Sequence, residues 1–477
     1  MSVSAYVEEN LEGEKEQDIP LHIWLDVIAP FFVSNGNIRN ELMTLLLLCK
    51  GMREVVELLL FSRLSDKVIT DIFSNHNIGL IRMVIHNQHI RHEYQSLLWL
   101  SCEYNYLDFV QELLMDPRFD PSFNDNAAIK EACANGNLEI VILLLKDHRV
   151  HPPLSALQCS CRNGHHSVVK ILMSDNRLDP SSDNNAAICW ACRNGHLQVV
   201  EILLNDERAN PSADNSYCIR MACRNGHTDI VKLLIKEGSS DLSSVDNYAI
   251  KWAAENSHIE IIKILLNMPS VDPTVYQHQS LRSACRNGHI EVVKLLLGDE
   301  RLDPAIRNNF CIRHASKSGR VEVVKLLLAN DRVDPCVNNN EPFRFACSEG
   351  HFEVAKLLLS DPRVDPSSTN NAAIRWACKN GHTEVVKLLL NDKRVDASSN
   401  DNSAIREACS NGHFLVVVEL LKQSNVDPTS YNNSALRHAS EKGHFNIVNA
   451  LKEDGRVLRY NQNVAKEVIN ETKIVMY

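Results

Sequence analysis

The hydrophobic and polar residues of this chain recur with a period of 31 residues. In each period, a run such as Ala-Ala-Ile-Arg-Trp-Ala-Cys (372–378) is followed by Gly381 and then by Val-Val-Lys-Leu-Leu-Leu (385–390). Both runs place apolar residues three and four apart, which is typical of short amphipathic helices. A polar stretch rich in Asp, Asn, Pro and Ser comes before each first run, and we expect its side chains to cap the helix that follows. Each period therefore predicts two short helices joined by a turn.

Glycine marks the predicted end of the first helix, because a left-handed residue without a Cβ suits that position. Ser257 fills the one vacant place in the glycine series, and Gly136, Asn105 and His76 lie at looser equivalent places before it. A helix pair this short cannot bury its apolar stripe alone, so we expect the pairs to stack, thirteen in all with two degenerate pairs at the start. The regular members of the series are Gly164, Gly195, Gly226, Gly288, Gly319, Gly350, Gly381, Gly412 and Gly443.

The period resembles the ankyrin repeat in both of its helices. The segment Gly-His-Thr-Glu-Val-Val-Lys-Leu-Leu-Leu at 381–390 is close to the second-helix consensus of that family, and residues 372–378 occupy the place of its Thr-Pro-Leu-His-x-Ala-Ala motif. The family's period is about 33 residues, so this one is shorter. The finger between helix pairs reads Val-Asp-Pro-Ser and then Asn-Asn where the family has Asp-x-x-Gly, and we expect Asn to take the left-handed position.

The resemblance implies an all-α fold, an ankyrin-repeat solenoid of helix-turn-helix units over residues 62–455. Residues 62–122 would hold the degenerate units and residues 123–455 the well-formed ones. The family implies protein binding, and arrays with an Arg-Val-Asp-Pro-Ser finger are similar to those of amoeboid protists and large DNA viruses. Residues 456–477 are expected to form a C-terminal cap or tail, with apolar positions at Leu458, Val464, Val468 and Ile474.

A different pattern precedes the repeats in residues 18–61, after an acidic segment, 1–17, that we expect to be disordered. Ile19-Pro20 matches the Leu-Pro start of the F-box family, and residues 45–53 match its Leu-x-x-Val-Cys-Lys-x-Trp-Arg core, so the segment resembles an F-box. The match departs at Met52, where the family has Trp.

The F-box resemblance implies a small helical module that docks on a Skp-type adaptor of an SCF (cullin-RING) ubiquitin ligase, with a protein target held by the ankyrin array. The alternative is that residues 18–61 only cap a plain ankyrin scaffold. The F-box interpretation requires an exposed apolar patch, whereas the cap does not. The expected adaptor-binding residues are Ile19, Pro20, Ile23, Trp24, Ile28, Leu45, Cys49 and Met52.

One position of the first helix varies from repeat to repeat, and we call it the variable slot. It follows the Ile-Arg pair, and in the ankyrin family this part of the helix faces the concave surface. Aromatic residues and Met in such a place suit the core of an interface, although they could equally pack on neighbouring fingers. The expected target-binding residues are Trp190, Met221, Trp252, His314, Phe345, Trp376 and His438.

Charge bears on the class of partner. The chain has 50 Lys plus Arg against 60 Asp plus Glu, a formal charge of −10, which argues against a nucleic-acid binder. Two basic ladders nevertheless run through the first helices, and they could contact an acidic partner or pair with an acidic ladder in the second helices. The ladders are Lys130, Arg220, Lys251, Arg282, Arg313, Arg344, Arg375, Arg406 and Arg437, and then Arg162, Arg193, Arg224, Arg286, Lys317 and Lys379.

Cysteine and histidine do not predict an active site, a metal site or a cofactor. Cysteines such as Cys192 share a slot with Ala254 and Ser316, so that slot requires a small residue rather than a thiol. One His per repeat follows the glycine, where we expect it to form a hydrogen bond at the start of the second helix. No glycine-rich phosphate loop occurs. We therefore expect a protein that is not an enzyme.

The chain also shows no sign of secretion. Its apolar runs, such as 45–49, are too short to span a bilayer, and no apolar stretch near its start forms a signal peptide. Fifteen cysteines in such a chain favour a reducing compartment, which predicts an intracellular protein, cytoplasmic or nuclear, in the host cell if the source is viral.

Overall fold

Each period of the sequence folds as a pair of antiparallel helices in the computed structural model, which describes residues 69–70, 73–76, 78–86, 96–117, 119–238 and 241–474. All regular structure in these residues is helical, as expected for an all-α solenoid. The F-box-like segment 18–61 lies outside the described residues. Within them, no helix is both long and apolar enough to cross a membrane. The chain divides into two units, Met1–Asn210 and Pro211–Tyr477.

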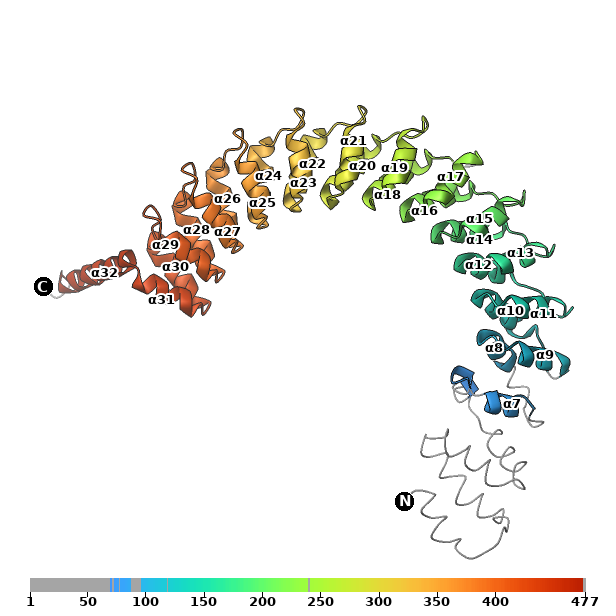
Figure 1. The fold of residues 1–477 in the computed structure, drawn as a ribbon. Helices are drawn as coiled ribbons and strands as arrows, with labels where there is room; N and C mark the ends of the chain where they lie inside the picture. Colours follow the sequence, from blue (N-terminus) through green and yellow to red (C-terminus); the bar gives the residue numbers. More distant parts are fainter. Residues whose placement is uncertain are drawn as a thin grey trace, which may run out of the picture. The chain divides into compact units, whose positions relative to one another are not determined.

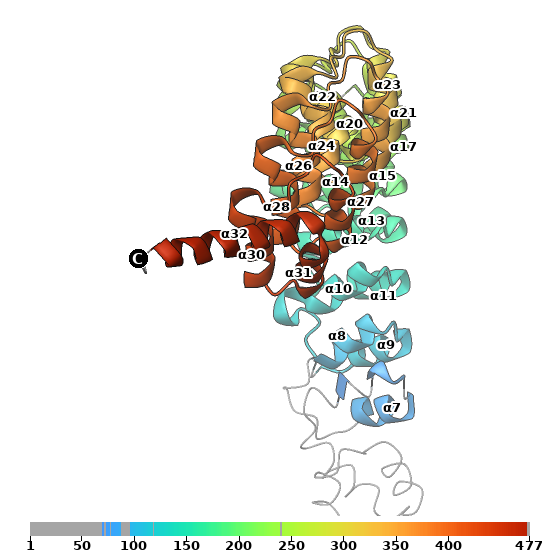
Figure 2. The same cartoon turned by 90° about the vertical axis from the view of Figure 1, so that its left-hand side faces the viewer.

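The first unit contains four complete helix pairs in its described part, and α7 is the second helix of a further pair. Successive first helices pack against one another, and Figure 2 shows α10 and α12 in one layer with α11 and α13 in the other. The first helices are α8 (Ser96–Glu103), α10 (Phe123–Asn135), α12 (Leu154–Asn163) and α14 (Ser182–Asn194). The second helices are α7 (Ile78–His86), α9 (Leu107–Met115), α11 (Leu138–Leu145), α13 (His166–Met173) and α15 (Leu197–Leu204).

The second unit contains eight helix pairs, which follow one another in order along the chain in Figure 1. Its first helices are α16 (Ala213–Asn225), α18 (Ser244–Glu255), α20 (Val275–Asn287), α22 (Ile306–Lys317), α24 (Val337–Ser348), α26 (Ser368–Lys379), α28 (Ser399–Ser410) and α30 (Ser430–Glu441). Its second helices are α17 (Thr228–Lys236), α19 (Ile259–Leu266), α21 (Ile290–Leu297), α23 (Val321–Leu328), α25 (Phe352–Leu359), α27 (Thr383–Leu390), α29 (Phe414–Leu421) and α31 (Phe445–Glu453).

The core lies between the two helix layers, where the periodic apolar residues are buried. In the repeat of α26 and α27, for example, Ile374, Cys378, Val386 and Leu389 are all fully buried. The same positions are buried in the neighbouring repeats, so each helix pair completes the core of the next one.

The expected left-handed residues are present at the end of the first helices. Gly381 has φ +80°, and Ser257, which fills the vacant place in the glycine series, has φ +65°. Asn105 (φ +58°) and His76 (φ +53°) adopt the same conformation in the degenerate units. The equivalence inferred from the spacing is therefore confirmed in backbone geometry.

The finger differs from the expectation in one respect. Near the start of the first helices of the second unit, inside the bounds given above, three consecutive residues are left-handed where all three are described. In α24 these are Asn338, Asn339 and Asn340, with φ of 54°, 58° and 59°. The third Asn does not cap its own helix as predicted, because Asn340 Oδ1 accepts a hydrogen bond from Asp365 N of the next finger, at 3.0 Å. Ser216 Oγ and His278 Nδ1 accept the equivalent bond where Asn is replaced. This side chain therefore links one repeat to the next.

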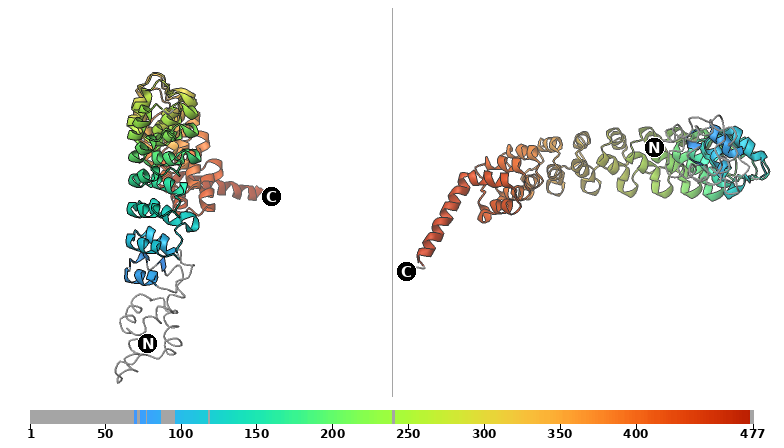
Figure 3. Two further views of the ribbon diagram at one scale, coloured as in Figure 1. Left: turned by 90° about the vertical axis from the view of Figure 1, so that its right-hand side faces the viewer. Right: turned by 90° about the horizontal axis from the view of Figure 1, so that it is seen from below.

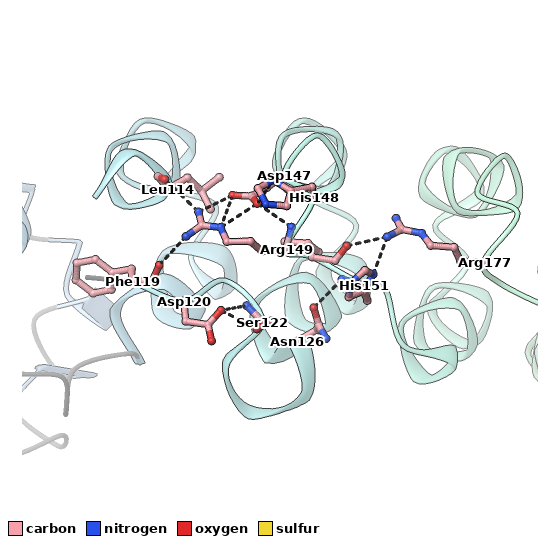
Figure 4. Close-up of polar contacts among 11 residues, drawn as sticks. Leu114, Phe119, Asp120, Ser122, Asn126, Asp147, His148, Arg149, His151 and Arg177 are labelled. Atoms are coloured by element: carbon pink, nitrogen blue, oxygen red, sulfur yellow. Dashed lines mark hydrogen bonds and ion pairs between the residues drawn. The ribbon is translucent and has the colours of Figure 1, made fainter. Parts of the chain in front are cut away.

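An arginine and an aspartate two residues before it form a second link, which we call the latch. Arg149 donates through Nη2 to Asp147 Oδ2 at 2.6 Å and through Nη1 to Phe119 O of the preceding finger at 3.3 Å (Figure 4). The same pair recurs as Asp175–Arg177, Asp206–Arg208, Asp299–Arg301, Asp361–Arg363, Asp392–Arg394 and Asp454–Arg456.

The C-terminal segment is a helix, α32 (Gly455–Ile474), which projects beyond α31 in both views of Figure 3. Its first turn is anchored, because Val457 is fully buried and Arg456 donates to Val426 O at 2.7 Å. Leu458 and Val464, the predicted apolar positions, are 47% and 39% exposed. The buried residue that anchors this helix is therefore Val457, one residue before the predicted Leu458.

Candidate protein-binding surface

The variable slot occupies equivalent places on successive first helices. Trp190 lies on α14 of the first unit, and the remaining slot residues lie on α16 to α30 of the second. Met221 is buried, at 4% exposure, and is part of the core. The others are half-buried, so each contacts the protein on one side and solvent on the other: Trp190, Trp252, His314, Phe345, Trp376 and His438.

Basic side chains cover the aromatic rings of the slot. In the second unit the cation comes from the preceding first helix: the guanidinium of Arg224 lies 5.1 Å from the ring centre of Trp252, and that of Arg344 lies 5.2 Å from Trp376. Lys317 Nζ lies 5.2 Å from the ring of Phe345. A cation at such a distance is attracted to the ring by its quadrupole. The slot residues therefore join neighbouring repeats and remain partly open to solvent.

Two aromatic residues that the sequence analysis missed extend this surface. Tyr248 stacks on Trp252 with ring centres 5.0 Å apart, and Phe310 stacks on His314 at 3.8 Å. Each lies four residues before its slot residue, which places both on one side of the helix. That spacing was the available signal. We call Tyr248, Trp252, Phe310, His314, Phe345 and Trp376, with the cations that cover them, the aromatic-cation face.

The first basic ladder contacts the fingers rather than the acidic ladder. Arg344 donates from Nε to Asn339 O at 3.0 Å and from Nη2 to Asn338 O at 2.9 Å. These carbonyls belong to the left-handed turn, which lacks the usual helical partners. Equivalent bonds to turn carbonyls are made by Arg220, Arg282, Arg375 and Arg406.

The acidic ladder pairs within the second helices, as its spacing predicted. Lys263 Nζ lies 2.7 Å from Glu260 Oε1, and Lys387 Nζ lies 2.7 Å from Glu384 Oε1. Both partners of these pairs are largely exposed, so each pair contributes little to the stability of the fold. These carboxylates pair with lysines of their own helices. They therefore do not neutralise the first-helix cations that cover the aromatic rings.

The periodic cysteines are core residues. Cys192, Cys223 and Cys378 are fully buried, and burial raises the pKa of the Cys223 and Cys378 thiols well above their ordinary value. Burial also raises the pKa of Cys133 and of Cys409 to about 12. A buried thiol of high pKa is a poor nucleophile and metal ligand. Among the described residues, no three His, Cys, Asp or Glu side chains gather as a metal site would require.

The periodic histidines lie at the start of the second helices and have a structural role, as predicted, but their hydrogen bond joins the preceding repeat and does not cap the second helix. His382 Nε2 donates to Ser348 O of the preceding repeat at 2.9 Å, and Arg320 Nε makes the equivalent bond to Arg286 O at 3.1 Å where His is absent. The carbonyl at the end of one first helix is thereby satisfied by the next repeat. These histidines do not converge on a common point.

The expected adaptor-binding residues Ile19, Pro20, Ile23, Trp24, Ile28, Leu45, Cys49 and Met52 lie outside the described residues. Their exposure and their contacts therefore stay predictions. Of the two expected binding sites, only the variable slot lies within the described residues.

Stacked pairs of short helices, joined by left-handed glycines and short fingers, define a helical repeat protein. A family model described as ankyrin repeats (3 copies) matches residues 132–215, 219–308, 281–370 and 374–462, which together make up more than half of the chain. The chain belongs to the ankyrin-repeat family. No curated protein matches it.

Proposed function

We propose that the protein binds a protein target through the variable slot and the aromatic-cation face. Ankyrin repeats are protein–protein interaction modules, and the proposal adds which side chains make the contact. One observation carries it: aromatic or imidazole rings occupy this place on α14, α18, α22, α24, α26 and α30 and are left half-exposed instead of being buried. Half-exposed aromatic side chains with arginine neighbours are the residues that contribute most to protein interfaces.

The proposed role is non-enzymatic. The polar groups that a catalytic site could use recur from repeat to repeat and have structural roles: His382 binds a carbonyl of the preceding repeat, and Arg344 binds a turn carbonyl of its own repeat. A reaction centre requires a local constellation that differs from its surroundings. The repeated pattern supports a binding surface.

Affinity capture with the full-length protein tests the target-binding face. Alanine at Trp252, Phe345 and Trp376 together is expected to abolish target capture, because the rings supply the apolar contact area. The matched control replaces three exposed phenylalanines outside the slot, Phe123, Phe414 and Phe445, and should leave capture unchanged. If both variants lose target capture equally and unfold at the wild-type temperature, the target does not bind specifically through the variable slot.

We further propose that residues 18–61 connect the array to an SCF (cullin-RING) ubiquitin ligase, which would make the protein a substrate receptor. The support is the sequence motif: Ile19-Pro20, Ile23 and the 45–53 core resemble an F-box. The alternative function is a plain ankyrin scaffold in which this segment is only a cap.

Co-purification with a Skp-type adaptor separates receptor from scaffold. The full-length protein is expected to bind the adaptor, and Trp24→Asp should abolish this binding because a charge would enter an apolar interface. The Trp252, Phe345 and Trp376 alanine variant is the control, since it should retain the adaptor. If the folded wild-type protein does not bind the adaptor, the plain ankyrin scaffold is the function that remains.

A further inference from the structure

Two adjacent first helices of the second unit carry a concentration of positive charge. α20 contains Arg282 and Arg286, and α22 contains Arg307, Arg313 and Lys317, whereas neither helix contains an aspartate or a glutamate. The two helices pack against each other. The formal charge of the whole chain is −10, so these five cations reverse the sign of the charge locally.

These cations act on common neighbours. Burial lowers the pKa of Arg282, and the charges of Arg307 and Arg286 lower it further. Burial likewise lowers the pKa of His314, followed by the charges of Arg313, Lys317 and Arg286, with Glu341 as the opposing carboxylate. Positive potential therefore accumulates around Arg282 and His314.

Two of these five cations, Arg313 and Arg282, bind other groups of the protein. Arg313 Nε lies 2.7 Å from Glu341 Oε2, and Arg282 donates to Gln277 O and Tyr276 O at 2.8 Å each. The side chains of Arg286, Arg307 and Lys317 are exposed. None of these three takes part in an ion pair within residues 241–474. Three cations are thus available to an external anion.

The aromatic residues between these cations favour a polypeptide over a nucleic acid. The ring of Phe310 is stacked by His314 at 3.8 Å and covered by Arg282 at 4.8 Å, and the ring of Phe345 is covered by Lys317. Binding of single-stranded nucleic acid relies on open ring faces that stack on bases. The negative charge of the chain also opposes a polyanion longer than this patch. A guanidinium, in contrast, binds a single carboxylate with two parallel hydrogen bonds.

We propose that Arg286 and Lys317, which hold equivalent places near the ends of α20 and α22, bind aspartate or glutamate side chains of an extended acidic segment in the protein partner. The proposal rests on the protein-binding function above and adds the chemistry of the partner. Neighbouring helices lie about 8–10 Å apart, and an extended chain in the polyproline II conformation has three residues per turn and advances about 3.1 Å per residue, so residues three apart lie on one side. Carboxylates about three residues apart therefore match cations on consecutive first helices.

Fluorescence anisotropy with a labelled peptide tests this proposal. The probe is an extended peptide of about 15 residues, long enough to cross several first helices, with Glu at every third position. The full-length protein is expected to bind it, and Arg286→Gln with Lys317→Gln should raise Kd about tenfold or more through the loss of two charge-assisted contacts.

The matched control removes the same charge from the second helices of the same two repeats. Lys294→Gln with Lys325→Gln deletes lysines that pair with Glu291 and Glu322 at 2.7 Å and 2.6 Å. Because these lysines lie on α21 and α23, the Kd for the peptide should change by no more than about twofold. Equal weakening in both variants would show general charge attraction and overturn the proposal.

Other outcomes also decide the matter. Absence of saturable peptide binding, or tighter binding of a single-stranded DNA of similar length or of a peptide with phosphoserine in place of Glu, would overturn the acidic-segment assignment. The two proposals can fail separately. If the alanine variant of Trp252, Phe345 and Trp376 loses the target but the Arg286 and Lys317 variant retains it, the binding face stands and the acidic segment is wrong.

Discussion

The imidazole of His413 fills the space into which a Cβ at Gly381 would project. Such a Cβ would lie 2.5 Å from His413 Nδ1, while Nε2 of the same ring lies 2.9 Å from Lys379 O. Gly381 also has φ +80°, a conformation that costs other residues about 1–2 kcal/mol. The glycine is therefore required twice: by its own backbone and by the histidine of the next repeat.

Alanine at Gly381 should destabilise the array by more than backbone strain alone. We expect a loss of about 2 kcal/mol or more in the free energy of unfolding, measured by chemical denaturation, because the histidine must also move. Gly443→Ala is the matched control, since Gly443 has φ +74° but no atom within 4 Å of the added Cβ. The excess loss at Gly381 should shrink when His413 is also replaced by alanine. Additive effects of the two substitutions would contradict the steric coupling.

The left-handed turn predicts a stabilising substitution at Val245. This residue has φ +50°, and a β-branched side chain is strained in that region. It is 37% exposed, so Val245→Asn sacrifices little burial and should raise the free energy of unfolding by about 1 kcal/mol. The reciprocal control is Asn400→Val at the equivalent position, where φ is +56°, and it should destabilise by a similar amount. Equal melting temperatures for all three proteins would refute the strain.

Local sequence and spacing predicted most of this fold. The positions of Gly381, Ser257 and Asn105 foretold their left-handed backbone because chain geometry limits which residues tolerate it. The bond from Asp365 N to Asn340 Oδ1 was not predictable, since it joins residues 25 apart whose approach depends on the stacking of repeats. The cover of Trp376 by Arg344 escaped prediction for the same reason. A periodic sequence specifies each unit, and the contacts between units emerge only from packing.

A latch can be installed at Met268 and Ser270, in one of the two described finger junctions where both latch residues are replaced; the other junction holds Gln423 and Asn425. Met268 and Ser270 occupy the places of Asp and Arg, because Val271 N donates to Met268 O just as Val150 N donates to Asp147 O. In a double-mutant cycle, Met268→Asp and Ser270→Arg should show a favourable coupling of about 1 kcal/mol, since the new guanidinium gains both a carboxylate and finger carbonyls. Ser270→Arg alone should bring no gain. Zero coupling would mean that the latch geometry needs more than its two side chains.

The latch carboxylates make the array sensitive to acid. The hydrogen bond from Arg149 holds the pKa of Asp147 down at about 2, and the equivalent arginines lower the pKa of Asp361 and Asp392. An unfolded aspartate has a pKa of about 3.9, so between about pH 4 and pH 2 the unfolded chain binds protons that the folded chain does not. The latch contribution is therefore fully present above about pH 4 and is lost as the pH falls toward 2, which lowers the denaturation midpoint.

Asp147→Asn should flatten this decline because it removes one such group, whereas Asp331→Asn, an exposed carboxylate outside the latch, should leave the slope as in wild type. A decline of the same steepness in Asp147→Asn would assign the acid sensitivity to other carboxylates.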